Sequence, residues 1–383
     1  MKILAIVPSG FCFGLQNLTL AFFGNLSSRF QSFFLNSRWS DGEFSRRLDT
    51  LGLPYSATWL GMFSRRLDPH NLKMTLHCLF KLPIAWWDFW RTYRRFRPDV
   101  IYLANHHEMI LLWPLLLLLR QKVVCHMHDP PPAIPFQKMS FAVWRLAVGR
   151  FFFISENVRE RTALLGPPGP NDIVVHNGIR VAPLAWPRVR DGRFAREFDW
   201  PADSIVVGIT GQMTETKGHE DFVAAARMCA EENPRLRFVI GGKLLEPMAT
   251  RLQAQVREHG LEAKAKFSGW LPSPQDFFSA VDVLVLASRH DEGFGLVVAE
   301  AMERGAVAVS TRSGGATEII EDGVSGLLIQ KQAPREMADR LLRLAGDEAL
   351  RSRLARAGRL RVEQHFDLVR QVKEFEGRLA HGF

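Results

Sequence analysis

The sequence predicts an α/β protein of two domains, each built on a parallel β-sheet with helices on both faces. Three observations lead to this prediction. Across the 383 residues, short apolar runs alternate with helical stretches, once in each half of the chain. A segment at 181–203 that contains three prolines interrupts the alternation and indicates an interdomain connection. In the second half, glycine-rich turns follow the apolar runs, which is where open α/β sheets bind ligands.

The first half, residues 1–180, is expected to form an N-terminal domain. Its apolar runs predict strands at 2–7, 99–104, 122–128, 150–155 and 172–176. Helices are expected from about Leu15 and over the apolar run 109–119. This run is too short for a bilayer, which needs about 20 residues, so we expect a soluble or peripheral protein. The apolar run of MKILAIVPSG is also short for a signal peptide and is better explained as a buried first strand.

The second half is expected to form a C-terminal domain at 204–365, followed by a last helix within 366–383. Strands are predicted at 204–210, 237–241, 266–268, 281–288, 306–311 and 327–329. Two polar helices should follow at 334–345 and 348–365. The break His365-Phe366-Asp367 then separates the helix expected at 368–380.

Charge and cysteine content narrow the class of partner. Residues 1–180 hold 21 lysines and arginines against 11 acids, which leaves +10, while the second half is nearly neutral. Seven of the ten tryptophans also precede residue 150. Such a half favours an anionic partner, and because no nucleic-acid motif accompanies the charge, we expect an anionic membrane or lipid phosphate. The four cysteines match no metal or redox spacing and predict free thiols in the reducing cytoplasm.

Candidate ligand-binding turns in the second half all follow expected strands. Because parallel strands end at one edge of their sheet, these turns should converge there. Glycines let the backbone approach a phosphate closely, and helix N-termini stabilise anions. The turns are Gly211-Gln212-Met213 with Lys217-Gly218, Gly241-Gly242-Lys243, Gly269-Trp270, EGFG at 292–295 and SGGATE at 313–318.

These motifs resemble the retaining glycosyltransferases of family 4, the glycosyl transferases of group 1. The resemblance rests on GQMTETKG at 211–218, EGFGLVVAEAM at 292–302 and SGGATEIIEDGVSGLL at 313–328. It extends more weakly to VVCHMHD at 123–129, FISENVRE at 153–160 and VVHNGI at 174–179. It implies the GT-B fold, in which two Rossmann-like domains face a central cleft and the last helix crosses back to the first domain.

The resemblance also implies a reaction and its residues. A sugar would pass from a nucleotide-diphosphate donor to a glycan or lipid-linked acceptor with retention of its anomeric configuration and without a metal or cofactor. The family pattern implies that Glu292 contacts hydroxyls of the sugar, Glu300 those of the ribose, and Lys217 the diphosphate. The expected catalytic residues are His128, Lys217 and Glu292. The expected donor-binding residues are Gly14, Gln212, Gly242, Lys243, Trp270, Gly293, Phe294, Gly295, Leu296 and Glu300.

The chain departs from the family pattern at two places. Gln212 stands where the family usually has an arginine on the diphosphate, so Lys243 or Arg289 would have to supply the missing charge. Phe13-Gly14-Leu15-Gln16 stands where the first loop usually reads Gly-Gly-x-Glu. His126, two residues before His128, is expected on the opposite face of its strand.

The acceptor is expected to bind the first domain. Residues 77–97 combine Trp86, Trp87 and Trp90 with five basic residues, which suits an interfacial helix on anionic lipid at the inner face of the membrane. Arg46-Arg47 and Arg65-Arg66 also lie near phenylalanines. An ordinary core helix with a solvated basic face is an equal alternative, since Pro83 argues against one long amphipathic helix.

Two other functions stay open at this point. One is a sugar-nucleotide epimerase with the same fold, and the other is a homologue that binds a nucleotide sugar without catalysis. The chain lacks an Asp-x-Asp motif after a strand and a cluster with metal-ligand spacing, so we expect activity without metal. The donor sugar, the nucleobase, the acceptor and the oligomeric state are not specified by these residues.

Overall fold

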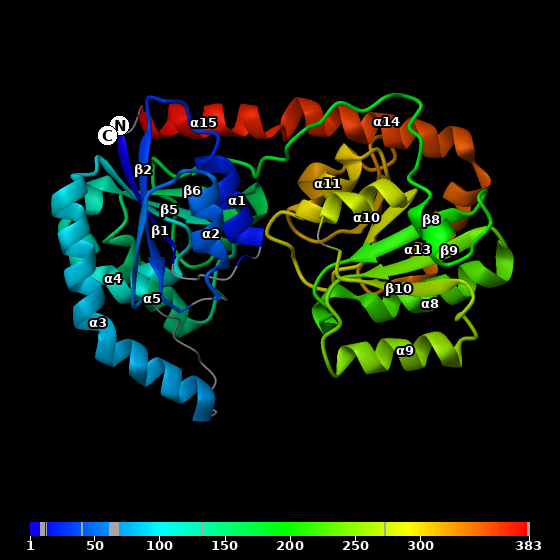
Figure 1. Cartoon of the computed structure of the whole chain (residues 1–383), viewed down its shortest axis with the longest axis horizontal. Coiled ribbons are helices and arrows are strands. Elements are labelled where there is room, and N and C mark those ends of the chain that lie inside the picture. The colour runs from blue at the N-terminus through cyan, green and yellow to red at the C-terminus, as the bar shows by residue number, and fades with distance from the viewer. Residues whose placement is uncertain are drawn as a thin grey trace. The chain divides into compact units, whose positions relative to one another are not determined.

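The structure is a computed structural model that describes residues 1–7, 12, 14–39, 41–60, 69–131, 133–271 and 273–380, without the side chains of 69–71, 74 and 107–110. Phe13, Arg65 and Arg66 lie outside the described residues. The chain divides into two compact units (Figure 1), one of Met1–Gly178 with Leu368–Phe383 and the other of Ile179–Asp367. Each unit contains one parallel sheet with helices on both faces, which confirms the predicted fold class.

The sheet of the first unit has seven parallel strands in the order β3-β2-β1-β4-β5-β6-β7. Buried and mostly apolar residues make up β4, β5 and the part of β1 after Lys2, as expected of central strands covered on both faces. The strands are β1 Lys2–Val7, β2 Gln31–Ser37, β3 Tyr55–Thr58, β4 Val100–Leu103, β5 Val123–Met127, β6 Arg150–Phe153 and β7 Ile173–Val174.

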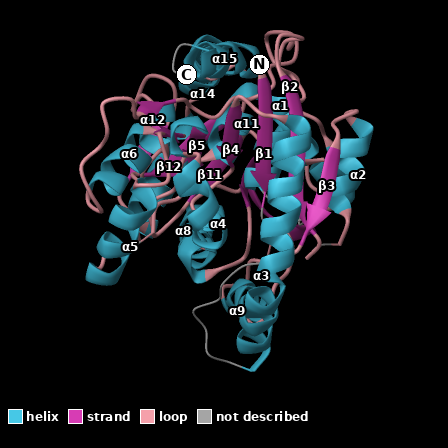
Figure 2. Ribbon diagram, turned by 90° about the vertical axis from the view of Figure 1, so that its left-hand side faces the viewer, coloured by secondary structure: helices cyan, strands magenta, loops and turns pink. Residues whose placement is uncertain are grey.

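Two groups of helices cover this sheet. On one side α1 contacts both α2 and α15, and on the other α3 contacts α4 and α4 contacts α5 (Figure 2). Phe375 of α15 packs edge-on against Phe22 at 5.6 Å and Tyr102 at 5.8 Å between ring centroids. The helices are α1 Gly14–Phe23, α2 Glu43–Thr50, α3 Pro69–Phe96, α4 His107–Leu118, the short η1 Arg120–Lys122, α5 Pro135–Arg145, α6 Glu156–Ala163 and α15 Leu368–Ala380.

Helix α3 runs unbroken through Pro83, so the expectation that this proline argues against one long helix was wrong. A proline removes one backbone hydrogen bond and bends a helix, but packing can outweigh that cost. Here Cys78, Ala85 and Phe89 are buried, so the helix packs against the unit on both sides of the proline.

The sheet of the second unit has six parallel strands in the order β10-β9-β8-β11-β12-β13. Alternate residues enter separate cores, since Val206 and Leu284 lie in one cluster while Val207 and Val283 lie in the other. The strands are β8 Ile205–Thr210, β9 Leu236–Gly241, β10 Ala265–Gly269, β11 Val283–Leu286, β12 Val307–Thr311 and β13 Leu327–Ile329.

Helices connect these strands, and the proline-containing segment packs with them. Arg188 of that segment donates to the carbonyl oxygens of Gly305 at 3.0 Å and Ser279 at 2.6 Å, which ties residues 179–203 to the second unit. The helices are α7 Arg193–Glu197, the short η2 Glu215–Lys217, α8 His219–Glu232, α9 Met248–Glu258, α10 Pro274–Ala280, α11 Leu296–Glu303, α12 Ala316–Ile319, α13 Pro334–Gly346 and α14 Glu348–His365. Among the described helices, none is long and apolar enough to cross a membrane.

Candidate functional site

The point where the strand order reverses in the second unit lies between β8 and β11. From β8 the chain proceeds outward through β9 and β10, and from β11 it proceeds the other way through β12 and β13. Ligands of open α/β sheets bind outside the carboxyl ends of the strands at such a point. The loop after β8 ends at Lys217 and the loop after β11 contains Glu292, so this edge is where the two predicted catalytic groups meet.

Lys217 and Glu292 form an ion pair. The Lys217 Nζ donates to Glu292 Oε1 at 2.6 Å, and the Ser288 hydroxyl donates to the same oxygen. Both side chains keep access to solvent, with 33% and 18% of their surfaces exposed, so an incoming ligand can reach them. His219 is buried beside Lys217, and its pKa is lowered to about 4 by burial and then by the Lys217 charge. The imidazole is therefore neutral near pH 7 and adds no cation.

The turn that carries Glu292 is held against the loop after β12. Gly315 N donates to the Glu292 carbonyl oxygen at 2.9 Å, and a Cβ at Gly315 would lie 2.4 Å from the Gly293 carbonyl oxygen. Gly295 has φ 99°, a conformation that favours glycine, and it immediately precedes α11. Phe294 is buried, while Leu296 opens the helix. The N-terminal N–H groups of α11 are donors without partners inside their own helix, which suits an anion.

Glu300 lies one turn further along α11 and is partly buried. Burial and the nearby Glu303 charge raise the pKa of its carboxyl to about 7. Among the described residues, none donates to this carboxylate, whereas Glu303 is paired with Arg359 at 2.8 Å. An acid kept in such surroundings without a partner is typical of a ligand-binding group, because burying an unpaired charge is unfavourable.

The two predicted substitutes for the missing arginine differ, since Arg289 is paired with acids and Lys243 is not paired with any described residue. Arg289 makes two hydrogen bonds with Asp221, at 2.7 and 2.9 Å, and lies 3.3 Å from Glu220, so its charge is already neutralised. Lys243 is exposed, and no described residue accepts a hydrogen bond from it, which leaves it available. Gln212 is exposed as well. Of the predicted cations, Lys243 is therefore unpaired among the described residues, and Lys217 is paired only with Glu292 of the site itself.

Further glycines fix the loops after β8, β9 and β10. Gly242 has φ 119°, and a Cβ there would lie 2.2 Å from the Gly211 carbonyl oxygen, so these two loops touch backbone to backbone. Gly242 N also donates to the Gly269 carbonyl oxygen at 3.0 Å. Trp270, next in the chain, is 70% exposed and available for stacking.

Two predicted site residues, His128 and Gly14, lie in the first unit. His128 follows β5, and burial together with neighbouring His126 holds its pKa well below the usual range, so its ring is neutral. The rings of His126 and His128 lie 4.7 Å apart, so the expectation of opposite faces was wrong, because residues two apart on a strand share a face. His126 is buried and bonds the Tyr102 hydroxyl at 2.8 Å. Gly14 is the exposed first residue of α1, next to a loop that lies largely outside the described residues.

Ser288, Asp221 and His219 touch the candidate site and were not predicted, although the position of Ser288 at the end of an apolar run was a signal for it. No group of three or more described His, Cys, Asp or Glu side chains could hold a metal ion.

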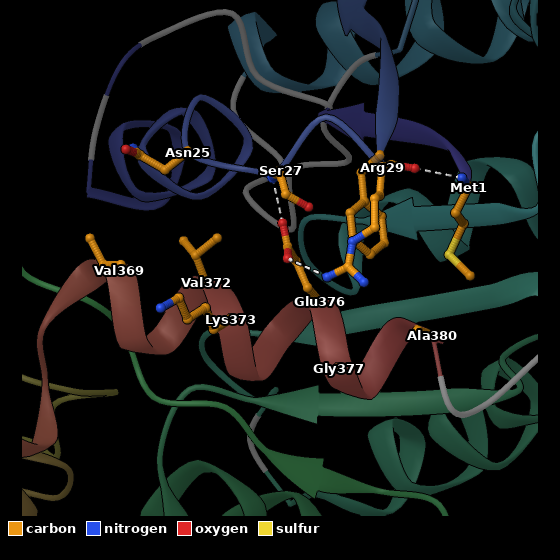
Figure 3. Close-up of a pocket in the computed structure, with 11 residues that line it drawn as sticks. Met1, Asn25, Ser27, Arg29, Val369, Val372, Lys373, Glu376, Gly377 and Ala380 are labelled. Carbon is orange, nitrogen blue, oxygen red and sulfur yellow. Dashed lines mark hydrogen bonds and ion pairs between the residues drawn. The ribbon is translucent and has the colours of Figure 1, made fainter.

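A cavity of about 760 Å³ lies in the first unit beside α15 (Figure 3), where Glu376 faces Arg29 and Ser27. Its lining does not include any predicted site residue.

Comparison with known families matches two adjoining parts of the chain. Residues 192–361 match the model described as "Glycosyl transferases group 1", and residues 59–182 match "Glycosyltransferase Family 4". The lipopolysaccharide core biosynthesis glycosyltransferase LpsE of Rhizobium meliloti is 32% identical over 42% of this chain and 46% of its own. The D-inositol 3-phosphate glycosyltransferase of Thermomonospora curvata is 31% identical over 54% of this chain and 51% of its own. The chain thus spans about half the length of the curated relatives it matches.

Solved structures show the same fold along the whole chain. Anabaena Alr3699/HepE in complex with UDP and glucose has a TM-score of 0.79 at 21% identity, over 99% of both chains. The lipopolysaccharide outer core galactosyltransferase WaaB has a TM-score of 0.69 at 17% identity over 100% of both chains. The chain therefore combines a family 4 glycosyltransferase domain, matched at residues 59–182, with a group 1 glycosyltransferase domain, matched at residues 192–361, and each of its two units has its own parallel sheet.

Proposed function

We propose that the protein transfers a sugar from a nucleotide-diphosphate donor to a glycan or lipid-linked acceptor, with retention of the anomeric configuration. The observation that carries this proposal is the placement of Lys217, Glu292 and Glu300 around the start of α11, at the point where the strand order of the second sheet reverses. One cation, helix N–H groups and two carboxylates match the diphosphate, the sugar and the ribose of such a donor.

Lys217 and the start of α11 act on the leaving diphosphate. As the glycosidic bond breaks, negative charge grows on the diphosphate, and fixed donors that point at this charge lower the barrier. Lys217 is held close by Glu292 until a phosphate competes for its ammonium group. The N–H groups that follow Gly295 add donors that need no reorganisation.

The two glutamates bind hydroxyl groups. A carboxylate accepts two hydrogen bonds from a vicinal diol, and the Glu300 carboxylate has none from described residues. Glu300 therefore binds the ribose, and Glu292 binds the transferred sugar, where positive charge develops. Neutral His128 of the first unit donates to or accepts from a sugar hydroxyl rather than acting as a cation.

The reaction is proposed to need neither metal nor cofactor. Lys217, the helix N–H groups and exposed Lys243 supply the positive charge that a divalent cation would otherwise bring to a diphosphate. The proposed donor-binding set is Gly14, Gln212, Gly242, Lys243, Trp270, Gly293, Phe294, Gly295, Leu296 and Glu300.

A binder without catalysis is the second candidate, because Gln212 brings no charge and Arg289 is committed to Asp221. Purified protein, incubated with a panel of nucleotide-diphosphate sugars, separates the two functions. A transferase releases nucleotide, by slow hydrolysis without an acceptor and faster with one. Stabilisation by a donor without any release would identify the binder. An epimerase would instead change the sugar of the recovered donor.

A further inference from the structure

Helix α3 of the first unit exposes a face that is apolar and cationic and holds no acid. Spacing at 100° per residue places all its exposed residues within an arc of about 160°. The described helix has one acid, Asp88, which is partly buried and accepts from the Thr58 hydroxyl at 2.7 Å. The exposed residues are Leu72, Lys73, Leu76, Leu79, Phe80, Pro83, Ile84, Trp87, Arg91, Arg94 and Arg95.

Neighbouring helices continue this surface. The Trp86 indole of α3 donates to the Leu111 carbonyl oxygen of α4 at 2.8 Å, and the Trp113 indole of α4 donates to that of Val143 of α5 at 3.0 Å. The three helices are therefore joined side by side. On α4 and α5 the exposed side chains include Leu118, Phe136, Lys138, Met139 and Val143, and no described residue of either helix with an exposed side chain is an acid. We call the exposed residues of α3 with these five the α3–α5 face.

The C-terminal end of α3 contains a hollow suited to a phosphate. A cavity of about 410 Å³ is lined by Trp87, Trp90, Arg91, Arg94 and Arg95. The Arg94 guanidinium lies over the Trp90 ring at 5.2 Å from its centroid. None of these three arginines has an acid partner among the described residues, so their charge is open to an external anion.

The size and charge of this face point to lipid. Phe80 is 79% and Trp87 is 66% exposed, which is costly for side chains that face only water. A nucleic acid would leave the apolar side chains of this face exposed to water. Aromatic and aliphatic side chains beside arginines are the composition of helices that lie in the membrane interface. Figure 1 shows the N-terminal half of α3 extending beyond the sheet of its unit, which leaves this part of the face accessible.

We propose that the α3–α5 face docks the protein on an anionic phospholipid membrane. Leu76, Phe80 and Trp87 enter the boundary between headgroups and acyl chains, and Arg91, Arg94 and Arg95 hold lipid phosphates in the hollow. The docking surface lies in the first unit alone. It rests on the proposed function at one point, since docking on a membrane favours a lipid-linked acceptor.

Flotation with vesicles tests this proposal. The full chain is mixed with phosphatidylcholine vesicles that either contain or lack phosphatidylglycerol. Arg91→Gln/Arg94→Gln/Arg95→Gln removes the cations, Phe80→Ser/Trp87→Ser removes the aromatics, and Arg257→Gln/Arg353→Gln/Arg356→Gln removes three exposed cations of the second unit as a charge-matched control. Circular dichroism confirms that each variant is folded.

We expect binding only to the anionic vesicles, with a steep decrease between about 0.1 M and about 1 M salt as the Debye length shrinks. The triple variant on α3 should bind roughly 100-fold more weakly, since each cation near the surface contributes about a factor of five. The Phe80→Ser/Trp87→Ser variant should bind the anionic vesicles at least about tenfold more weakly. The control variant should bind nearly as well as the wild type.

Equal binding to neutral vesicles, equal loss in the control, or full binding by either α3 variant would overturn the proposal. So would a wild-type protein that ignores anionic vesicles at low salt. Nucleotide release from a soluble donor, measured without vesicles, reports on the proposed sugar transfer separately, so failure of one does not imply failure of the other.

Discussion

Glu300 is a residue whose burial costs stability, as expected of the ligand-binding role proposed for it. Its carboxyl pKa is raised from the ordinary 4.5 to about 7 by burial and by the Glu303 charge, so the fold favours the neutral acid. The cost to stability begins as the pH rises through about 4.5 and is complete above about 7. Glu300→Gln removes this cost and keeps the shape of the side chain.

We therefore expect Glu300→Gln to stabilise the ligand-free protein at pH 8 by up to about 3 kcal/mol and to leave stability near pH 4 unchanged. The same substitution should weaken donor binding, because an amide accepts fewer hydrogen bonds from the ribose. Urea unfolding at the two pH values and calorimetry with the donor measure the two effects. Glu258→Gln, at an exposed acid of α9, is the control. Lower stability of Glu300→Gln at pH 8 would contradict this account.

Gln212 is the second residue with a direct test. Because Arg289 is held by Asp221, exposed Lys243 is the one remaining predicted substitute for the arginine of the family pattern. Gln212→Arg should raise the turnover of the proposed reaction by roughly tenfold, since a hydrogen bond to a charged group contributes about 1.5–3 kcal/mol. Gln121→Arg, at an exposed position of the first unit, controls for net charge. If Gln212→Arg leaves turnover unchanged, another group already supplies the charge.

At this scale the sequence predicted which residue types gather, but not how they pair. Lys217 and Glu292 come together as expected, because both lie at the carboxyl ends of adjacent strands. Their mutual ion pair and the Ser288 bond depend on side-chain rotamers, which no motif specifies. The hydrogen bonds between Arg289 and Asp221 join positions 68 residues apart in the chain, so the sequence did not predict them either.

The turn before α11 depends on contact with the loop after β12. Gly315 has φ −59°, so alanine fits its backbone, but the added Cβ would lie 2.6 Å from Phe294 Cα. Gly315→Ala should displace the turn that carries Glu292 and weaken donor binding at least tenfold, in the range for a misplaced catalytic group. Gly346→Ala, where a Cβ meets nothing within 4 Å, is the control. Wild-type donor affinity in Gly315→Ala, measured by calorimetry, would show that this packing does not position the turn.

Among the elements, strongly apolar strands and long polar helices were predicted well. The expected bounds of β1, β13, α14 and α15 match those of the structure. Strands β2 and β3 were not predicted, because QSFFLNS and YSAT mix polar and apolar residues and lie toward the edge of the sheet. Helix α3 was misjudged at Pro83, since tertiary packing of Ala85 and Phe89 overrides a local penalty.

For the whole molecule, two parallel sheets followed from the repeated alternation of strands and helices. The compact units place the last helix with the first sheet and the proline-containing segment with the second. That assignment depends on contacts such as Phe375 with Phe22 and Arg188 with Gly305, which connect distant parts of the chain. The acceptor role of the first domain stays a prediction.

Metal dependence is measured on the full chain. We expect nucleotide release to continue in EDTA, because Lys217, Lys243 and helix N–H groups supply the positive charge that stabilises the leaving diphosphate. The measurement compares initial rates with EDTA, with added Mg²⁺ and with added Mn²⁺. Loss of activity in EDTA with recovery in either metal would show that the diphosphate needs a cation that these residues do not replace.

The rate of nucleotide release in three variants tests the central claim most directly. With a donor that the wild type uses, Lys217→Ala should slow turnover by about 100- to 1,000-fold, as the loss of one fixed donor to a developing charge does in other enzymes. Glu292→Ala should mainly reduce turnover, and Glu300→Ala should mainly raise the donor concentration needed. Lys373→Ala, an exposed cation on α15, should match the wild type. Near-normal release by Lys217→Ala, Glu292→Ala and Glu300→Ala would contradict the proposed site.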